Sequence, residues 1–529
     1  MVENQDSWPS IAAMVHDRAT ANADEVAIVE DERALTYAEL LESARRFAGA
    51  LVADGVGPRD RVAVWAPNGT EWIVSVLGIH LAGATLIPVN TRFKGFEASD
   101  LLQRGRVSVL VTVTDFLGTD YVDLLQSSES VELPDLRTIV VARGPATAPG
   151  VGWTDFLARA TTADLDEVDR RRDAVQPDDP ADILFTSGTT GVPKGVVSGQ
   201  RQSLAVASDW ARMTGLRRGD RYLMVNPYFH MFGLKAGILV SVMTGARMLP
   251  MPVFDAGRAL ALVEQHAVTV FPGPPTLYQS VLDHPDRDHV DLSSLRVAVT
   301  GAADIPVELI RRIYAELPFD VVVSGYGLTE AGTAASTAHD DSPETIATTV
   351  GRARPGFEIR LVDSFDVPVP AGAVGQILVR GPSVMSGYLD EPATTESVLT
   401  DDGWLRTGDL GTHLPDGTLR IVGRTKEMFL VGGFNAYPAE IEQILMRHPA
   451  ISAAAVVAVP DERLGEVGTA FVVAREPLDA ASVIAWAREH MANYKVPRFV
   501  TVLDDLPLTA TGKVHKSALH QRAITERTS

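Results

Sequence analysis

A short run of glycine, hydroxyl and lysine residues follows an apolar segment about a third of the way along the chain. The apolar segment is 183–185, and the run extends from Thr186 to Gly195. Its three glycines let backbone N–H groups approach an anion, its four hydroxyls can donate to phosphate oxygens, and its lysine adds positive charge. This composition predicts a phosphate-binding loop rather than a plain strand–helix turn. It is not a Walker A loop, because the chain has no Gly-x4-Gly-Lys-Ser/Thr spacing. The residues expected to contact phosphate are Thr186, Ser187, Gly188, Thr189, Thr190, Gly191 and Lys194.

Strand-like and helix-like segments alternate along most of the chain. Residues 71–81 have helical spacing, and residues 85–89 form a short apolar run that is typical of a strand. The run 107–113 also predicts a strand, as does 295–300, which leads through Gly301-Ala302-Ala303 into a helical pattern. Strands that alternate with helices favour parallel α/β sheets.

The pattern changes in the last third of the chain. Between about 351 and 422, short apolar runs are divided by glycine, proline and aspartate, which predicts a mostly β subdomain. From residue 438 the order is helix, strand, strand, helix, strand. We therefore predict an α/β protein: a large N-terminal domain of stacked α/β sheets plus a β subdomain, and a small α+β C-terminal domain.

Composition excludes several classes of protein. With 47 basic and 68 acidic side chains, the net charge is −21, so we expect no nucleic-acid partner. The absence of cysteine excludes disulfides, thiolate metal sites and a cysteine nucleophile, so any reactive thiol must come from a partner. The amino terminus has no signal-peptide pattern. The most apolar stretch, 72–88, is too short and too interrupted for a membrane span, and a buried helix that leads into a strand explains it better. We expect a cytoplasmic protein with no integral membrane segment, as a monomer or a homodimer.

The phosphate loop resembles that of the adenylate-forming superfamily, which includes acyl-CoA synthetases, peptide-synthetase adenylation domains and luciferases. Other motifs of the superfamily follow in its order over essentially the whole chain. They are Tyr326-Gly-Leu-Thr-Glu330, Gly403-Trp-Leu-Arg-Thr-Gly-Asp409, the hinge segment from Gly423 to Glu442, and Pro507-Leu-Thr-Ala-Thr-Gly-Lys513.

The resemblance implies how a nucleotide is held. Thr329 contacts the α-phosphate, Glu330 holds Mg²⁺, and Asp409 accepts hydrogen bonds from the ribose hydroxyls. Arg424 contacts ribose or phosphate. The residues implied around adenine are Tyr326, Gly327, Gly301, Ala302 and Ala303.

The resemblance also implies two half-reactions. A carboxylate attacks the α-phosphate of ATP, and Lys513 bridges these two anions. The CoA thiol then attacks the acyl-AMP, after the small mobile domain has rotated about Lys426. Gly432, Gly433 and Phe434 would line the CoA tunnel. The implied boundaries are residues 1–423 for the N-terminal domain with its β subdomain at about 351–423, 424–426 for the hinge, and 427–529 for the C-terminal domain.

The turn 226–233 resembles the element that walls the acyl pocket and gates the thiol tunnel; the alternative is a core turn with a satisfied histidine. The acyl-pocket residues are then Tyr228, His230, Phe232, Gly233 and Gly325, with His230 among the catalytic residues. The two glycines leave width for a ring system. Asp255 precedes a helical pattern at 256–266, so we expect an N-cap there rather than a carboxylate that binds an amino group.

We therefore predict an ATP-dependent acyl-CoA ligase for a bulky apolar acid, either polycyclic or fatty, with ATP, Mg²⁺ and coenzyme A. In its sequence pattern the chain most resembles actinobacterial ligases for ring-bearing propionates from steroid or terpenoid breakdown. Alternatives are a free-standing enzyme that loads a carrier protein, a luciferase-like oxygenase and an inactive nucleotide sensor. Gln200 stands where histidine is frequent and Glu427 where aspartate is common, so a weak adenylation half-reaction is another alternative.

Overall fold

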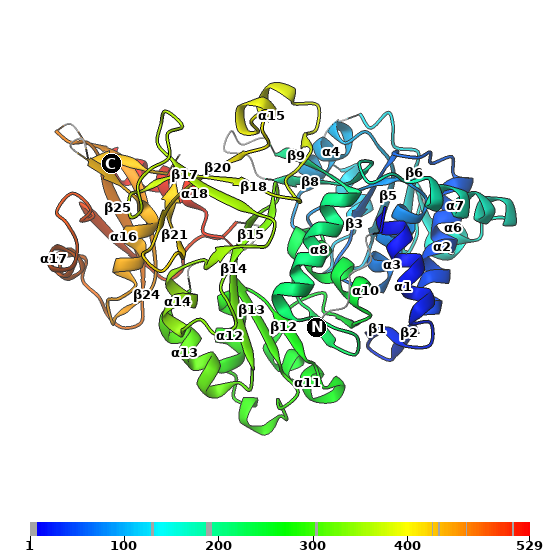
Figure 1. Ribbon diagram of the computed structural model, residues 1–529, viewed down its shortest axis with the longest axis horizontal. Coiled ribbons are helices and arrows are strands. Elements are labelled where there is room, and N and C mark those ends of the chain that lie inside the picture. Colours follow the sequence, from blue (N-terminus) through cyan, green and yellow to red (C-terminus); the bar gives the residue numbers. More distant parts are fainter. Residues whose placement is uncertain are drawn as a thin grey trace.

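The computed structural model describes residues 8–127, 132–186, 193–301, 305–425, 427–431, 434–461, 463–509 and 513–528. Two large mixed sheets, a four-stranded antiparallel sheet and a separate C-terminal sheet form its framework (Figure 1). This is the predicted α/β architecture, with a large N-terminal part and a small C-terminal one.

The first large sheet has nine strands and is parallel in its centre. Its outer strands β16, β15 and β2 run antiparallel to their neighbours. In spatial order the strands are β16 (Arg352–Ala353), β15 (Gly332–Ser336), β14 (Val321–Leu328), β13 (Val297–Gly301), β12 (Val270–Pro272), β10 (Arg221–Met224), β11 (Arg247–Pro250), β1 (Val26–Glu30) and β2 (Arg33–Thr36).

The second large sheet has eight strands. All seven residues of its strand β5 are buried, as expected of a strand that is covered on both faces of a parallel sheet. In spatial order the strands are β19 (Gly387–Tyr388), β9 (Lys194–Gly199), β8 (Pro180–Thr186), β4 (Thr85–Pro88), β3 (Arg61–Trp65), β5 (Val107–Val113), β6 (Thr138–Arg143) and β7 (Gly150–Gly152).

Helix α3 (Thr70–Leu81) lies in the buried core that joins the two large sheets. Every residue in it except Glu71 is buried, and Phe47, Ile73 and Met248 belong to one apolar cluster. A helix that is apolar on all sides has to be buried. The most apolar stretch of the chain is thus an internal helix followed by strand β4, as predicted, and within the described part of the chain no helix is long and apolar enough to cross a membrane.

The other N-terminal helices pack on or between these sheets, and α11, α12 and α13 cover the outer face of the nine-stranded sheet (Figure 1). They are α1 (Ile11–Ala21), α2 (Tyr37–Ala53), α4 (Gly95–Arg104), α5 (Tyr121–Gln126), α6 (Trp153–Leu157), α7 (Thr162–Ala174), α8 (Gln200–Thr214), α9 (Met231–Gly233), a π-helix (Leu234–Leu239), α10 (Val240–Thr244), α11 (Ala256–His266), α12 (Pro275–Leu282), a 3₁₀ turn (Arg287–His289), α13 (Val307–Glu316), α14 (Pro343–Thr348) and α15 (Pro392–Val398).

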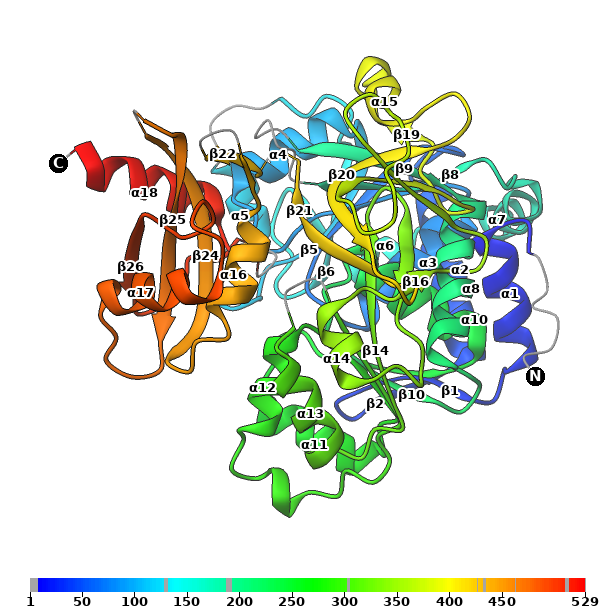
Figure 2. The ribbon, with the colours of Figure 1, turned by 60° about the vertical axis from the view of Figure 1, so that its left-hand side comes forward.

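The four-stranded sheet consists of β17 (Glu358–Val362), β18 (Gly375–Arg380), β20 (Leu405–His413) and β21 (Leu419–Arg424). The C-terminal part has its own buried cluster and stands to one side of the rest in both views (Figures 1 and 2). Its elements are β22 (Phe429–Val431), β23 (Phe434–Ala436), α16 (Pro438–Leu445), β24 (Ile451–Asp461), β25 (Gly465–Ala474), α17 (Ala480–His490), β26 (Phe499–Leu503) and α18 (Lys516–Thr528).

Candidate active site

A tyrosine, an aspartate and an arginine from three strands meet where the nine-stranded and four-stranded sheets adjoin. The Tyr326 hydroxyl of β14 donates to Asp409 Oδ2 at 2.6 Å. Arg424 Nε lies 3.0 Å from Asp409 Oδ1, and Asp409 and Arg424 face each other across the antiparallel pair β20–β21. Asp409 is 6% exposed, whereas Arg424 is exposed. Burial, with the charge and hydrogen bond of Asp409, raises the pKa of Tyr326 well above its usual value, so its hydroxyl remains a donor.

A second group joins the exit of the phosphate loop to Glu330. Glu330 lies in the turn between β14 and β15, and its Oε1 accepts a hydrogen bond from the Tyr388 hydroxyl at 3.0 Å. Lys194 Nζ lies 4.9 Å from the centre of the Tyr388 ring, a cation–π contact. Thr329 is half-buried in the same turn. The sequence analysis did not predict Tyr388 as a site residue. The available signal was its position, directly after a glycine and shortly before the acidic pair Asp390–Glu391.

Lys513 comes to this site from the C-terminal part. The Lys513 N–H donates to Thr509 Oγ1 at 3.2 Å. Arg92 of the N-terminal part donates to the Thr509 carbonyl at 3.5 Å. The Lys513 side chain still reaches solvent, but surrounding protein lowers its pKa, helped by the positive charge of Arg424 and opposed by the carboxylates of Asp409 and Glu330. Lys513 therefore lies among the residues that were predicted to hold the nucleotide.

His230 adjoins the same space from the turn before the π-helix. Its Nδ1 accepts a hydrogen bond from the Phe232 N–H at 3.2 Å, so the ring carries its proton on Nε2. Burial, helped by the positive charge of Lys513, lowers the pKa of His230 to about 4. The imidazole is therefore neutral near pH 7.

The aromatic residues of this turn pack away from one another. Tyr228 is 1% exposed and contacts Trp72 in the core, with ring centroids 5.4 Å apart. The Phe232 ring is half-buried against Trp210 of α8 at 5.2 Å. Tyr228 is thus buried beneath the turn, and its place in the wall of an acyl pocket stays a prediction.

Of the two glycines expected to widen the acyl pocket, Gly233 has a local reason to be glycine and Gly325 is tightly packed. A Cβ at Gly233 would lie 2.2 Å from the Pro227 carbonyl oxygen, and a Cβ at Gly325 would lie 3.3 Å from Thr333 Cγ2. Gly233 is therefore required by the backbone of its own turn. Gly233 therefore gives no support for a wide pocket, and the width expected from Gly325 stays a prediction.

The predicted phosphate loop connects two antiparallel strands, not a strand and a helix. Thr186 and Lys194 are register partners at the ends of β8 and β9. Arg104 of α4 donates to the Pro193 carbonyl at 2.7 Å and lies 5.4 Å from the Phe185 ring centre, so it fixes both ends of the loop. Gly301 ends β13, and a Cβ at Gly327 would lie 2.4 Å from the Gly332 carbonyl oxygen. Several predicted site residues lie outside the described residues: Ser187, Gly188, Thr189, Thr190, Gly191, Ala302, Ala303, Lys426, Gly432, Gly433 and the side chain of Phe434.

The two departures from the superfamily pattern have structural roles. Gln200 is 2% exposed, and its Oε1 accepts from the Ile11 N–H at 3.0 Å, which ties helix α1 to α8. Glu427 pairs with Lys516 at 2.9 Å inside the C-terminal part. Asp255 caps α11 by accepting from the Arg258 N–H at 2.8 Å, which confirms the predicted N-cap.

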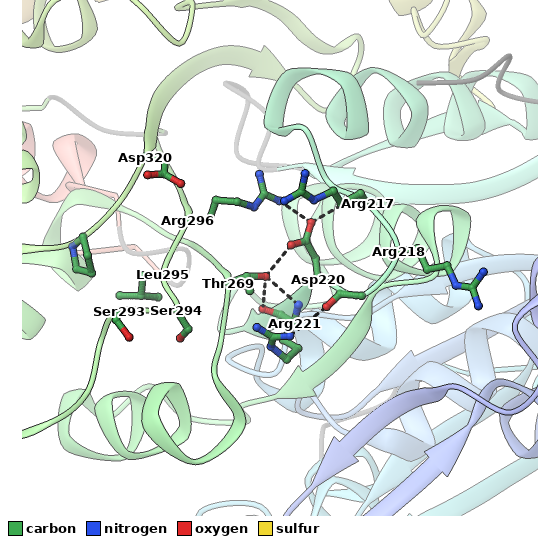
Figure 3. Close-up of a pocket in the computed structure, with 12 residues that line it drawn as sticks. Arg217, Arg218, Asp220, Arg221, Thr269, Ser293, Ser294, Leu295, Arg296 and Asp320 are labelled. Atoms are coloured by element: carbon green, nitrogen blue, oxygen red, sulfur yellow. Dashed lines mark hydrogen bonds and ion pairs between the residues drawn. The ribbon is translucent and has the colours of Figure 1, made fainter. Parts of the chain in front are cut away.

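A surface cavity of about 400 Å³ lies away from this site (Figure 3). It opens where β10, β13 and β14 begin, beside the pair of Arg296 and Asp220 at 2.5 Å, with Thr269 donating to Asp220 at 2.9 Å. The nucleotide candidates Gly301 and Tyr326 lie in the C-terminal parts of β13 and β14, so this cavity is at the opposite edge of the sheet. Among the residues that the structure describes, no group of three or more His, Cys, Asp or Glu side chains could hold a metal ion.

Comparison with known families defines the class. Residues 15–389 match the family of AMP-binding enzymes, and residues 440–513 match the AMP-binding enzyme C-terminal domain. The chain belongs to the AMP-binding enzyme family.

Similar proteins narrow the class to CoA ligases. The chain is 47% identical over 499 residues to a 3-[(3aS,4S,7aS)-7a-methyl-1,5-dioxo-octahydro-1H-inden-4-yl]propanoyl:CoA ligase of Rhodococcus jostii, covering 94% of this chain and 95% of that one. It is 48% identical to a Mycobacterium tuberculosis ligase of the same name, covering 94% and 96%. Among solved structures, the anthranilate CoA ligase AuaEII in complex with anthranoyl-AMP is similar with a TM-score of 0.84 and 26% identity, covering 97% of each chain. The protein is an AMP-forming acyl-CoA ligase with ATP and CoA as substrates.

Proposed function

We propose that the acid activated by this ligase is a bulky apolar carboxylic acid with a ring system on a propionate chain. The supporting observation is the identity of 47% and 48%, over 94% of the chain, to two ligases named for a methyl-dioxo-octahydroindenyl propanoyl group. Identity of this extent, spread over both domains, favours a related acid over an unrelated one.

The chemistry of the His230 turn agrees with an acid that has no α-amino group. His230 is neutral near pH 7, and the neighbouring residues Met231 and Phe232 are apolar. Asp255 is occupied as a helix cap. An ammonium group at this turn would lack a carboxylate partner in the described part of the turn, and an unpaired buried charge is strongly unfavourable.

The first half-reaction joins two anions, so the roles proposed for the polar residues follow from charge. A carboxylate oxygen of the acid attacks the α-phosphorus of ATP, the bond to the bridging oxygen breaks, and pyrophosphate leaves. Lys513, in its protonated form, would lie between the two anions and offset their repulsion. Asp409 has two oxygens with lone pairs beyond those used by Tyr326 and Arg424, and these accept from the ribose hydroxyls.

Magnesium fits the residues at the end of the phosphate loop. Glu330 supplies one carboxylate beside Lys194 and Tyr388, and Mg²⁺ is commonly held by one or two carboxylates plus substrate phosphates. The ion would neutralise phosphate charge. Thr329, in the same turn, would donate to an α-phosphate oxygen.

The second half-reaction needs Lys513 to leave. The CoA thiol attacks the carbonyl carbon of the acyl-AMP, the thioester forms, and AMP departs. The C-terminal domain would turn about Lys426 between the two steps, and Gly432, Gly433 and Phe434 would then face the pantetheine chain. We further propose that the enzyme acts in the cytoplasm.

A panel of acids tests the proposed substrate. Purified enzyme with Mg²⁺, ATP and CoA is given ring-bearing propionates, ferulate, fatty acids, acetate and amino acids, and kcat/KM is measured with acyl-CoA and AMP identified by mass spectrometry. We expect ring-bearing propionates to exceed acetate by at least about 10²-fold, because each buried methylene group contributes about 10-fold or more. A preference for acetate or for any amino acid contradicts the proposal.

A further inference from the structure

A lysine and an aspartate form an ion pair in the interior of the N-terminal domain, away from the nucleotide residues. Lys235 Nζ lies 3.0 Å from Asp182 Oδ1, and the two side chains are 2% and 1% exposed. The Lys235 ammonium also donates to Ser198 Oγ at 2.9 Å, and the Ser203 hydroxyl donates to Asp182 Oδ2 at 2.7 Å. Each charge therefore has a second polar partner.

The pair joins three elements. Asp182 lies in β8 and Ser198 in β9, and their Cα atoms are register partners in this antiparallel pair. Lys235 lies in the first turn of the π-helix Leu234–Leu239. One ammonium group thus holds both strands from the side of the π-helix.

These three elements carry the two proposed binding regions. Strand β8 ends at Thr186 and strand β9 begins at Lys194, on either side of the predicted phosphate loop. Four residues separate Asp182 from Thr186, which is about 13 Å along a strand at about 3.3 Å per residue. His230 precedes Lys235 by five residues and adjoins Lys513. Lys235 is thus shared by the scaffold of the phosphate loop and the scaffold of the acid turn.

The neighbouring histidine adds no charge that would explain the pair. His80 of α3 is 1% exposed, and burial, helped by the positive charge of Lys235, lowers its pKa to about 3. It is therefore neutral at working pH. The charges that balance inside this region are those of Lys235 and Asp182.

Stability alone is a poor reason for this arrangement. Moving two charges out of water is so unfavourable that apolar residues of similar volume are often as stable or more stable. A buried pair does, however, fix the relative position of the elements that carry it. π-helical turns are also frequent at functional sites.

We propose that Lys235 is a positioning residue for adenylation, and that its pair with Asp182 sets the distance between the acid-binding turn and the phosphate loop. In-line attack requires the carboxylate oxygen and the α-phosphorus at about 3–3.5 Å, so a small shift between the two scaffolds slows the reaction. Thioester formation takes place after pyrophosphate has left, and it does not need this distance. The inference rests on the places proposed above for the acid and the phosphates.

The test compares the two half-reactions in the same preparation of each variant. The variants are Lys235→Met, Asp182→Asn, the double variant Lys235→Met/Asp182→Asn, and the milder Ser203→Ala. Acyl-AMP formation is followed by pyrophosphate release, and thioester formation is followed from supplied acyl-AMP and CoA. Because only folded molecules catalyse both steps, the ratio of the two rates is independent of the folded fraction.

We expect the ratio of adenylation to thioester formation to fall by about 10- to 100-fold in Lys235→Met and in the double variant, and by about 2- to 5-fold in Ser203→Ala. The midpoint of thermal unfolding should fall most in Lys235→Met, where a buried carboxylate loses its partner, and should recover in the double variant. An unchanged ratio in the double variant, whatever its thermal midpoint, overturns the proposal.

A matched pair elsewhere in the same domain serves as the control. Arg296 and Asp220 lie 2.5 Å apart at the opposite edge of the nine-stranded sheet, with 19% and 5% exposure (Figure 3). Arg296→Met/Asp220→Asn should change thermal stability and leave the ratio of the two rates within about 2-fold. An equal fall of the ratio in this control would also overturn the proposal. All variants are assayed with whichever acid the wild-type enzyme turns over, so a wrong substrate class and a wrong role for Lys235 give different results.

Discussion

Asp409 and Lys513 adjoin the same site but are held in different ways. Asp409 is almost fully buried, it belongs to a central strand, and its two oxygens are fixed by Tyr326 and Arg424. Lys513 belongs to the small domain, where its N–H donates to Thr509, and its placement depends on how that domain sits. A residue that is fixed as Asp409 is can act in both half-reactions. A residue on the small domain, such as Lys513, can act in one half-reaction and then move away with that domain.

The largest expected effect follows from removing the charge of Lys513. Lys513→Ala should slow acyl-AMP formation by about 10²–10³, the scale of one lost charge-stabilising donor. Thioester formation from supplied acyl-AMP should change by less than about 10-fold, because Lys513 is then expected to be elsewhere. Rapid-quench measurement gives the rates of both half-reactions. Equal losses in the two rates would contradict a role of Lys513 that is specific to adenylation.

A change at the expected hinge should have the opposite selectivity. Lys426→Pro fixes one φ angle and should slow thioester formation by about 10² or more while adenylation stays within about 3-fold. The same two assays apply, with Lys426→Ala as the control that keeps the backbone free. Normal CoA ligation by the proline variant would place the pivot at another residue.

A change at the fixed residue Asp409 should affect both half-reactions. Asp409→Asn removes the charge opposite Arg424 and weakens the acceptor for Tyr326 and for ribose. We expect kcat/KM for ATP to fall by about 10- to 100-fold, and thioester formation to fall as well, because AMP is bound in both states. Asp366→Asn, which alters a surface pair with Arg406 in the same subdomain, is the control. A defect confined to adenylation would contradict this assignment.

The smallest expected effect is a change in the titration of His230. Burial and the charge of Lys513 lower its pKa to about 4, so removal of that charge in Lys513→Ala should raise the pKa by a few tenths of a unit to about 1 unit. NMR titration of labelled histidines measures this, with His230→Gln to assign the signal. His80, whose neighbouring charge is Lys235, should not move. If the pKa of His230 is unchanged, the small domain does not hold Lys513 near this ring in solution.

Local pattern predicted most elements, and ordered motifs predicted which residues carry the chemistry. The helix at 256–266 and its Asp255 cap could be predicted because both signals lie within a few residues. Tyr388 was missed because its partner Glu330 is 58 residues away in the sequence and the two meet only in the folded protein, where they come from different sheets. The burial of Tyr228 could not be predicted for a related reason: the sequence shows an aromatic residue in a turn but not which face of the turn is buried.

The structural reason for a glycine could not be predicted from the sequence either. Gly233 was interpreted as an opening in a pocket, but its missing side chain is required by a carbonyl oxygen 2.2 Å from the Cβ position. The sequence shows that a glycine is present but not why, because glycine is expected both where two backbone segments approach closely and where a pocket is wide. The buried Lys235–Asp182 pair gave no signal at all, because its members are 53 residues apart and ordinary in their local context.

The predicted phosphate loop is joined to two antiparallel strands, and helix α8 begins only at Gln200, after β9. Loops that open directly into a helix present its amino-terminal dipole to an anion, equivalent to about half a positive charge. Here strand β9 lies between the loop and helix α8, so the helix dipole does not act directly at the loop. In the proposed mechanism, the loop's N–H groups and hydroxyls and Mg²⁺ are therefore joined by discrete cations on separate segments, Lys194 beside the loop and Lys513 on the other domain. On this proposal the site has its full positive charge only while the small domain holds Lys513 there.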